Sequence, residues 1–310
     1  MVPTPECQFT PGRPSWRPHS ERWTGLRSLD RLSPVAGTVR AAEEQSDDEE
    51  EPVDTVTSKD GTSIAFDRLG DGPPVVLVCG GSVDRMANAG LAAALASDFT
   101  AYNFDRRGRG DSGDAPEYAV AREVEDIAAM IDAAGGSAHL YGTSSGAALA
   151  MEAAASGLPI RKLALWEPPY SVQGRPDLPD DTASVYRELV AAGRRGDAVE
   201  YFMLKVVGMP EEFAAAARQA PWWKDQEAIA HTLAYDATVM GDYTIPTERA
   251  RAVSVPTIIL VGGASFGFMA QTADALAALI PNAQRRTLEG QEHNVDPEVM
   301  AQALKQFFAS

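Results

Sequence analysis

The chain has 310 residues, of which 45% are hydrophobic and 23% are charged, a composition typical of a globular protein. Its formal net charge of −17 argues against nucleic acid or an anionic membrane surface as a partner, because both bind basic faces. No apolar run reaches the ~18 residues of a membrane helix, and residues 1–30 lack the apolar core of a secretory signal, so we expect a cytoplasmic protein.

Residues 1–52 differ from the rest of the chain. The first forty are rich in Pro, Arg, Ser and Trp without helical or strand periodicity, and an acidic run from Glu43 to Glu51 follows. Such a segment buries too little apolar surface to offset the entropy lost on ordering, so it is predicted to be a disordered N-terminal extension. It is either an interaction tail or a dispensable extension, and we favour the second interpretation.

Residues 53–310 read as one domain in which strands and helices alternate. Asp60-Gly61 predicts a hairpin turn between residues 55–57 and 62–66. Val75–Cys79 is a continuous apolar run, as expected for a central strand covered on both faces. Further strands are predicted at 99–104, 138–141, 162–166, 256–261 and 285–288, and helices at 87–96, 121–134, 147–155, 269–280 and 297–308. This alternation predicts an α/β fold with a doubly wound, mostly parallel sheet.

One segment interrupts the alternation. Residues 181–240 are helical in composition and contain no strand candidate. In a parallel-sheet enzyme, an insertion of this kind lies over the carboxyl edge of the sheet. We therefore predict a helical cap over about residues 175–245, above the site.

Gly142–Gly146 reads Gly-Thr-Ser-Ser-Gly and lies between a predicted strand and a predicted helix. A G-x-S-x-G in this context is a nucleophile elbow. The turn forces Ser144 into a strained backbone conformation, and the two glycines keep the helix clear of the neighbouring strand. Ser144 is the predicted nucleophile, exposed at the carboxyl edge of the sheet.

A serine hydroxyl needs a base within hydrogen-bonding reach, and the chain has four histidines. His19 lies in the N-terminal extension. His139 lies in the strand before the elbow, where a structural role is expected, and His231 falls in the cap, where a surface or packing role is expected. His293 follows the last strand, from which an imidazole can reach the elbow, so it is the predicted general base and later general acid.

Four segments of the chain together resemble the α/β-hydrolase superfamily. Cys79–Gly81 lies where that family carries His-Gly-x, and Asp105–Gly113 resembles its D-x-R-G-x-G-x-S loop. Gly142–Gly146 matches the elbow, and Gly290–His293 resembles the loop that delivers the catalytic histidine. The resemblance covers residues 55–310 in the family's order. It implies the α/β-hydrolase fold more specifically than it implies a reaction.

The third member of the triad departs from the pattern. The resemblance implies an acid after the strand at 256–261, but Ser265 occupies that place and no carboxylate is found there. A serine cannot supply the negative charge that stabilises an imidazolium. Glu167 follows the strand at 162–166, where some enzymes of this fold place their acid, and it is our candidate.

Other interpretations of the acid stay open. Glu167 could cap a loop or pair with an arginine such as Arg107. Asp242 and Asp296 are weaker candidates for the triad, and a Ser-His dyad without an acid is a further alternative.

The oxyanion hole is predicted to consist of the backbone N–H groups of Ser145, at a helix N-terminus, and Gly81. The basic, glycine-rich loop Asp105–Gly113 lacks the Lys-Ser/Thr ending of a P-loop and is predicted to brace the elbow. No metal-ligand cluster and no dinucleotide fingerprint are present in the sequence, so we expect no metal and no cofactor.

The sequence therefore predicts a serine hydrolase that cleaves an ester, thioester or lactone of a small, apolar substrate through an acyl-enzyme on Ser144. The alternatives are a non-hydrolytic member of the same fold, such as a cyclase, C–C bond lyase or perhydrolase, and a catalytically silent binding module. The missing acid after the strand at 256–261 makes the non-hydrolytic alternative more credible. The apolar preference rests on residues expected to line the space between sheet and cap: Trp166, Tyr170, Trp222, Trp223, Phe266, Phe268 and Met269.

Overall fold

The computed structural model describes residues 53–310, so the predictions made for residues 1–52, including the position of His19, lie outside the described part of the chain. The strands are β1 (Asp54–Thr57), β2 (Ser63–Leu69), β3 (Pro74–Val78), β4 (Thr100–Phe104), β5 (Ala138–Thr143), β6 (Ile160–Trp166), β7 (Thr257–Gly262) and β8 (Ala283–Leu288).

The helices follow the predicted alternation with strands. They are α1 (Ala89–Leu95), α2 (Val120–Ala133), α3 (Ser145–Ala155), α4 (Thr182–Ala191), α5 (Arg195–Tyr201), α6 (Glu211–Ala217), α7 (Trp223–Ala228), α8 (Leu233–Met240), α9 (Thr247–Ala252), α10 (Gly267–Leu279) and α11 (Pro297–Ala309). Shorter helical turns are η2 (Arg85–Asn88), η4 (Ala230–Thr232) and the π-helical η3 (Phe202–Val207). No helix of the described residues is long and apolar enough to cross a membrane.

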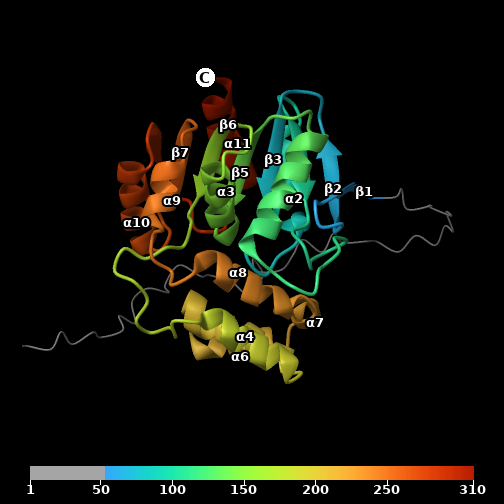
Figure 1. Ribbon diagram of the computed structural model, residues 1–310. Coiled ribbons are helices and arrows are strands. Elements are labelled where there is room, and N and C mark those ends of the chain that lie inside the picture. The colour runs from blue at the N-terminus through green and yellow to red at the C-terminus, as the bar shows by residue number, and fades with distance from the viewer. Residues whose placement is uncertain (1–52) are drawn as a thin grey trace, which may run out of the picture. The chain divides into compact units, whose positions relative to one another are not determined.

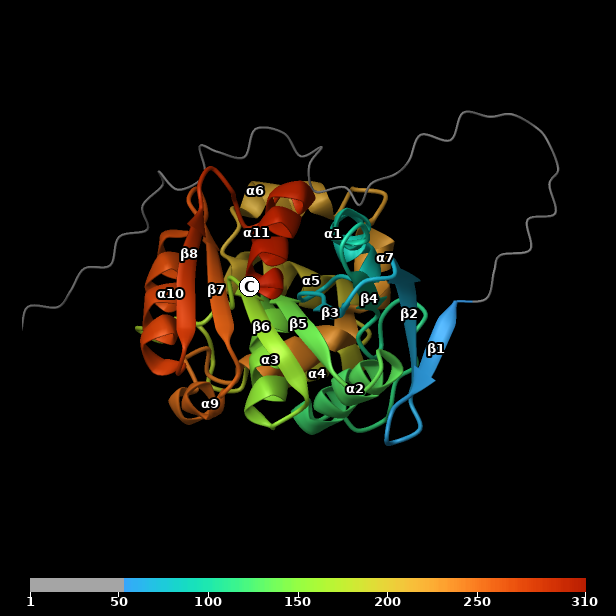
Figure 2. The same ribbon diagram turned by 90° about the horizontal axis from the view of Figure 1, so that it is seen from above.

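The eight strands form one sheet in the order β1-β2-β4-β3-β5-β6-β7-β8 (Figure 1). β1 pairs antiparallel with β2, and β2 pairs antiparallel with β4, whereas every other neighbouring pair is parallel. The predicted α/β class with a mostly parallel sheet is therefore confirmed. The crossover connections of the parallel strands bring helices onto both faces of the sheet (Figure 2).

Strand β3 shows why the central strands are continuously apolar. Val75 and Leu77 pack into the core beneath α1 and α11, whereas Val76 and Val78 pack into the core beneath α2, α3 and α10. All four side chains are fully buried. Both faces of the sheet are thus covered, and the carboxyl ends of the strands are left as the edge at which polar side chains can gather.

The helical insertion lies between β6 and β7 and contains no strand, as predicted. Its helices have their own apolar core, which includes Tyr186, Val199, Trp223 and Leu233. Helix α8 lies between α4 of the insertion and α3 of the sheet domain and packs against both, so it connects the insertion to the sheet (Figure 1). Helix α9 was not predicted from the sequence, because it buries only Ala250 and so leaves no apolar periodicity.

His139 in β5 has the structural role predicted for it. Its side chain is 6% exposed, and its ring stacks on Phe308 with the centroids 4.4 Å apart. Phe99 approaches the same ring edge-on at 6.1 Å. Among residues 53–310, Nδ1 of His139 has no hydrogen-bond partner. Burial in this apolar setting lowers the pKa of His139 to about 4.

We expect His139 to make the fold sensitive to acid. Its pKa is about 4 in the folded chain and ~6.5 when unfolded. The unfolded chain therefore binds the extra proton between these values, and stability from this group rises with pH across that window and is level above it. When the pH is lowered from 7.5 to 5, the free energy of unfolding of the wild type should fall by about 2 kcal/mol more than that of His139→Leu. Urea unfolding at both pH values measures this, and an equal loss in both proteins would contradict it.

Candidate active site

The carboxyl edge of the sheet carries backbone strain. In residues 53–310, five residues other than glycine have a positive φ, and three of them follow strands of the sheet. These are Ser82 after β3, Ser144 after β5 and Glu167 after β6, with φ values of 56°, 55° and 44°. Conformations of this kind persist where the surrounding structure enforces them, commonly at functional sites. The three turns therefore mark this edge as the candidate site.

Ser144 forms the predicted turn between β5 and α3. A Cβ atom on Gly142 would lie 2.4 Å from the carbonyl oxygen of Gly146, and one on Gly146 would lie 2.3 Å from the carbonyl oxygen of Cys79. Neither contact is sterically allowed, so both positions require glycine. The glycines of the G-x-S-x-G sequence thus perform the packing role expected of them.

Glu167 and His293 are hydrogen-bonded to each other. Oε2 of Glu167 lies 2.6 Å from Nδ1 of His293. The carboxylate is almost fully buried and also accepts the N–H of Gly262 and the hydroxyl of Ser265, each at 2.8 Å. Three donors satisfy a buried carboxylate that would otherwise be costly to desolvate. The contact holds the imidazole by Nδ1, so Nε2 is the nitrogen left to take up a proton.

The residues named in the other interpretations of the acid all have different partners or roles. Arg107 pairs with Asp126 at 2.7 Å and with Asp60 at 2.9 Å, rather than with Glu167. Asp242 accepts hydrogen bonds within its own turn. Asp296 caps the N-terminus of α11. Ser265, at the place where the resemblance implies an acid, donates to Glu167 instead.

Trp166 links the backbones of the elbow and of the histidine loop. Its carbonyl oxygen accepts the N–H of Ser144 at 2.8 Å, and its indole N–H donates to the carbonyl oxygen of His293 at 2.9 Å. Within the described part of the chain, no hydrogen bond joins Ser144 Oγ to the His293 ring. Catalytic hydrogen bonds of this kind often tighten only when substrate binds. Glu167 is thus hydrogen-bonded to His293, and the elbow and the histidine loop are both hydrogen-bonded to Trp166.

The two predicted oxyanion donors belong to the two backbone segments that meet at Ser144. Ser145 is the first residue of α3, where an N–H has no acceptor within the helix. Gly81 follows β3, and the neighbouring Gly80 lies against the elbow, since a Cβ there would be 3.2 Å from Cβ of Ser144. In residues 53–310, no acceptor is hydrogen-bonded to the N–H of Gly81 or Ser145. Both amides are therefore free to donate.

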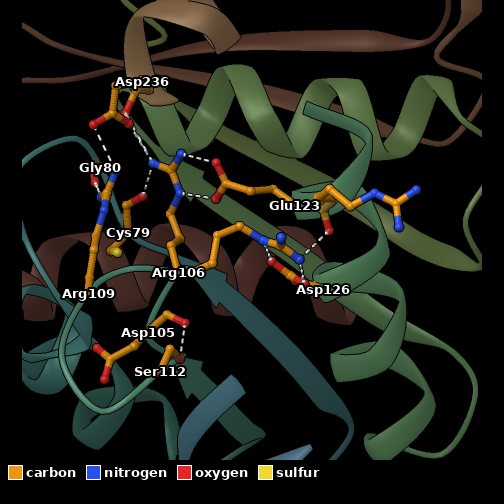
Figure 3. Close-up of polar contacts among 12 residues, drawn as sticks. Cys79, Gly80, Asp105, Arg106, Arg109, Ser112, Glu123, Asp126 and Asp236 are labelled. Carbon is orange, nitrogen blue, oxygen red and sulfur yellow. Dashed lines mark hydrogen bonds and ion pairs between the residues drawn. The ribbon is translucent and has the colours of Figure 1, made fainter. Parts of the chain in front are cut away.

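Arg106, Arg109, Glu123 and Asp236 form a buried ionic cluster (Figure 3). Asp236 places this cluster beside the two donors, because it accepts the hydroxyl of Ser145 and lies against Gly81. Arg106 donates to both oxygens of Glu123, at 2.6 and 2.7 Å, and to Oδ1 of Asp236 at 2.8 Å. Arg109 donates to Oδ2 of Asp236 at 2.8 Å and to the carbonyl oxygen of Gly80. The arginines of the basic loop are thus occupied by protein partners, in keeping with a bracing role.

Both carboxylates of the cluster are held in their charged form. Burial opposes ionisation of Asp236, but the guanidinium groups of Arg109 and Arg106 keep its pKa below the usual value. Burial likewise opposes ionisation of Glu123, and Arg106 lowers its pKa. Two cations and two anions therefore balance in a region that excludes water. Sequence reasoning missed Asp236 and Glu123, since neither belongs to a motif.

Most of the seven apolar residues expected to line the space between sheet and cap pack into the apolar cores. Phe266 does lie near the catalytic histidine, with its ring centroid 6.2 Å from that of His293, and Phe268 stacks on Phe266. The others contribute to packing. Trp166 lies in the core on one side of the sheet, and Tyr170 and Met269 lie in the core on the other side. Trp223 lies in the core of the insertion, and Trp222 packs against that core.

The remaining histidine also has a packing role. His231 in η4 contacts Asp114 at 3.3 Å and Arg195 at 3.0 Å.

Among the described residues, no group of three or more His, Cys, Asp or Glu side chains could hold a metal ion. Cys79 is a free, buried thiol whose pKa burial raises.

Comparisons with known proteins give a consistent result. A model of the alpha/beta hydrolase family matches residues 75–304. The crystal structure of an alpha/beta hydrolase from Sphaerobacter thermophilus is 55% identical, covers 82% of this chain and 100% of that one, and has a TM-score of 0.77. A thermophilic esterase from Thermogutta terrifontis is 24% identical, covers 83% of this chain and 98% of that one, and shares the fold with a TM-score of 0.64. N-formylmaleamate deformylase from Pseudomonas putida is 38% identical over 110 residues, which are 34% of this chain and only 41% of the relative's length.

Proposed function

Because the chain belongs to the alpha/beta hydrolase family, we propose that it is a cofactor-independent serine hydrolase acting on a small carboxylic ester, thioester or lactone. The observation that carries the proposal is the 2.6 Å contact between Glu167 and His293, tied through Trp166 to the elbow of Ser144. Nucleophile, base and orienting acid are the three roles that acyl transfer requires.

In the proposed reaction, Ser144 Oγ attacks the carbonyl carbon while Nε2 of His293 takes the hydroxyl proton. Glu167 fixes the tautomer of the neutral imidazole, with its proton on Nδ1, and stabilises the imidazolium that forms. The N–H groups of Gly81 and Ser145 donate to the oxyanion, and each such donor is worth about 3 kcal/mol in the transition state. His293 then protonates the leaving group, and a water activated by the same imidazole hydrolyses the acyl-enzyme.

The geometry around Glu167 weakens the case for a non-hydrolytic reaction. That case rested on the lack of an acid after β7. The carboxylate of Glu167, supplied from the end of β6, bonds to Nδ1 of His293, and Ser265 after β7 supports it by donating to the same oxygen. The acid is thus proposed to come from a different strand rather than to be missing.

A second candidate reaction is hydrolysis of an N-formyl group. It is favoured by the 38% identity over 110 residues to N-formylmaleamate deformylase. The same nucleophile, base and oxyanion donors serve amide and ester carbonyls alike, so the two candidates differ in substrate and not in machinery.

Labelling with a fluorophosphonate tests the proposal. We expect mass spectrometry of the digested protein to find one phosphonyl group on Ser144. Hydrolysis of p-nitrophenyl acetate and butyrate should fall in proportion to the labelled fraction. An N-formyl amide assayed alongside separates the two candidate reactions. A protein that neither reacts with the phosphonate nor hydrolyses any of these substrates would overturn the proposal.

A further inference from the structure

Asp236 reaches from the helical insertion into the sheet domain. It lies on α8, and its carboxylate is the shared acceptor of three donors, of which the two arginines are labelled in Figure 3. Oδ1 accepts from the hydroxyl of Ser145 and from Arg106, each at 2.8 Å, and Oδ2 accepts from Arg109 at 2.8 Å. The side chain is almost fully buried. Hydrogen bonds to both oxygens thus fix the position of the carboxylate.

The same carboxylate touches both backbone segments that supply the oxyanion donors. On one side it holds the hydroxyl of Ser145. On the other, a Cβ on Gly81 would lie 3.0 Å from Oδ2 of Asp236 and 3.3 Å from Oγ of Ser145, closer than most side chains approach, so a glycine suits the close approach of the two segments. Arg109 completes the connection, because it donates to Asp236 and to the carbonyl oxygen of Gly80.

A second helix of the insertion holds the same loop. Ser82, directly after Gly81, has a φ of 56° and donates its hydroxyl to Oε1 of Gln226 in α7 at 2.5 Å. The segment that carries Gly81 is therefore fixed from two helices of the insertion.

We propose that Asp236 is a positioning residue for the oxyanion hole. Through Ser145 directly, and through Arg109 to Gly80, it makes the N–H groups of Ser145 and Gly81 converge on one point. This inference rests on the proposed hydrolase function and deepens it, since it makes the docking of α8 a condition for transition-state stabilisation.

The charge of Asp236 is compatible with this role. A bare carboxylate beside an oxyanion hole would repel the developing negative charge. Here Arg106 and Arg109 bind it directly, and these cations also keep its pKa below the usual value. The carboxylate therefore acts as a fixed acceptor whose charge is already compensated.

Ser145→Ala is the first test, because it removes the hydroxyl but leaves the ion pairs of Asp236 and the backbone amide in place. We expect kcat for p-nitrophenyl acetate to fall about 10- to 100-fold, with KM changed less than about twofold. Affinity for a boronic acid, whose tetrahedral adduct occupies the oxyanion hole, should fall by the same factor. The melting temperature should fall by only a few degrees, as expected for the loss of one buried hydrogen bond.

A double-mutant cycle with Asp236→Asn separates positioning from stability. If both side chains act through their mutual bond, kcat of the double variant should match that of Asp236→Asn, because the effects of residues that act as a unit do not multiply. The matched control is Asp126→Asn, which weakens a buried pair with Arg107 at 2.7 Å. It should lower the melting temperature comparably and leave kcat unchanged.

The outcomes are distinguishable. An active wild type with an unaffected Ser145→Ala variant, or effects that multiply in the double variant, overturns the positioning role and leaves the hydrolase proposal standing. A wild type without labelling or turnover overturns both. If Asp236→Asn does not fold, Ser145→Ala and its boronate affinity still decide the question.

Discussion

Ser144→Ala should lower kcat for p-nitrophenyl acetate by about 10⁵-fold or more, the loss typical when the nucleophile of an acyl-transfer enzyme is removed. The fold should be unaffected. Alanine keeps the Cβ of serine, so the φ of 55° at this position costs the same in both proteins, and the side chain makes no capping hydrogen bond to α3. Steady-state kinetics and a melting temperature within about 2 °C of wild type check the two parts.

Ser112→Ala is the matched control for this prediction. Ser112 lies in the Asp105–Gly113 loop, where its hydroxyl donates to the carbonyl oxygen of Asp105 and accepts the N–H of Ala65. Its loss should reduce stability while kcat stays at the wild-type level. If Ser144→Ala kept more than about a hundredth of wild-type turnover, the nucleophile would have to be another group.

Glu167→Gln should lower kcat by about 10⁴-fold. The buried carboxylate accepts from Gly262, Ser265 and His293 at once. A glutamine offers one oxygen and an N–H₂ group, so it must present a donor to at least one of these partners. A donor opposite Nδ1 of His293 forces the proton onto Nε2, where the imidazole can no longer act as a base. The measurement is kcat and KM, with unfolding followed by urea.

Three variants separate this effect from a general disturbance. Ser265→Ala removes one donor to the carboxylate and should lower kcat only about tenfold, since the charge remains. Asp242→Asn and Asp296→Asn replace carboxylates engaged in their own turn or helix cap, and both should leave kcat unchanged. Near wild-type turnover of Glu167→Gln would exclude its role in orienting His293.

The fold and the elbow could be predicted because their signals are local. The strand, turn and helix around Ser144 occupy one continuous segment, and the two glycines have to avoid backbone atoms close by. The carboxyl end of β6 could be located from the apolar run that ends at Trp166. A residue that follows such a run lies at the edge of a parallel sheet, and this placed Glu167 near the elbow.

The partners of these residues depend on contacts that the sequence pattern does not encode. Ser265 supports Glu167 because β6 and β7 are neighbours, a pairing that follows from the sheet order. Asp236 meets Ser145 across 91 positions of the chain, and nothing in its helix distinguishes it from a surface aspartate. An apolar side chain is equally ambiguous. Trp166 ends β6 facing α1 and α11, so it packs in the core instead of lining the site.

The ion pairs that join Asp236 of α8 to Arg106 and Arg109 limit how the insertion can be changed to alter substrate preference. Excising or swapping the whole insertion would leave Arg106 and Arg109 without their shared counter-ion in a dry interior, and breaking one partner out of a buried ion pair costs about 3–5 kcal/mol. Helices α4 to α6 make no ion pair of this kind with the sheet in the described chain. Grafts that diversify specificity are therefore best confined to those helices, with the aspartate of α8 retained in every chimera.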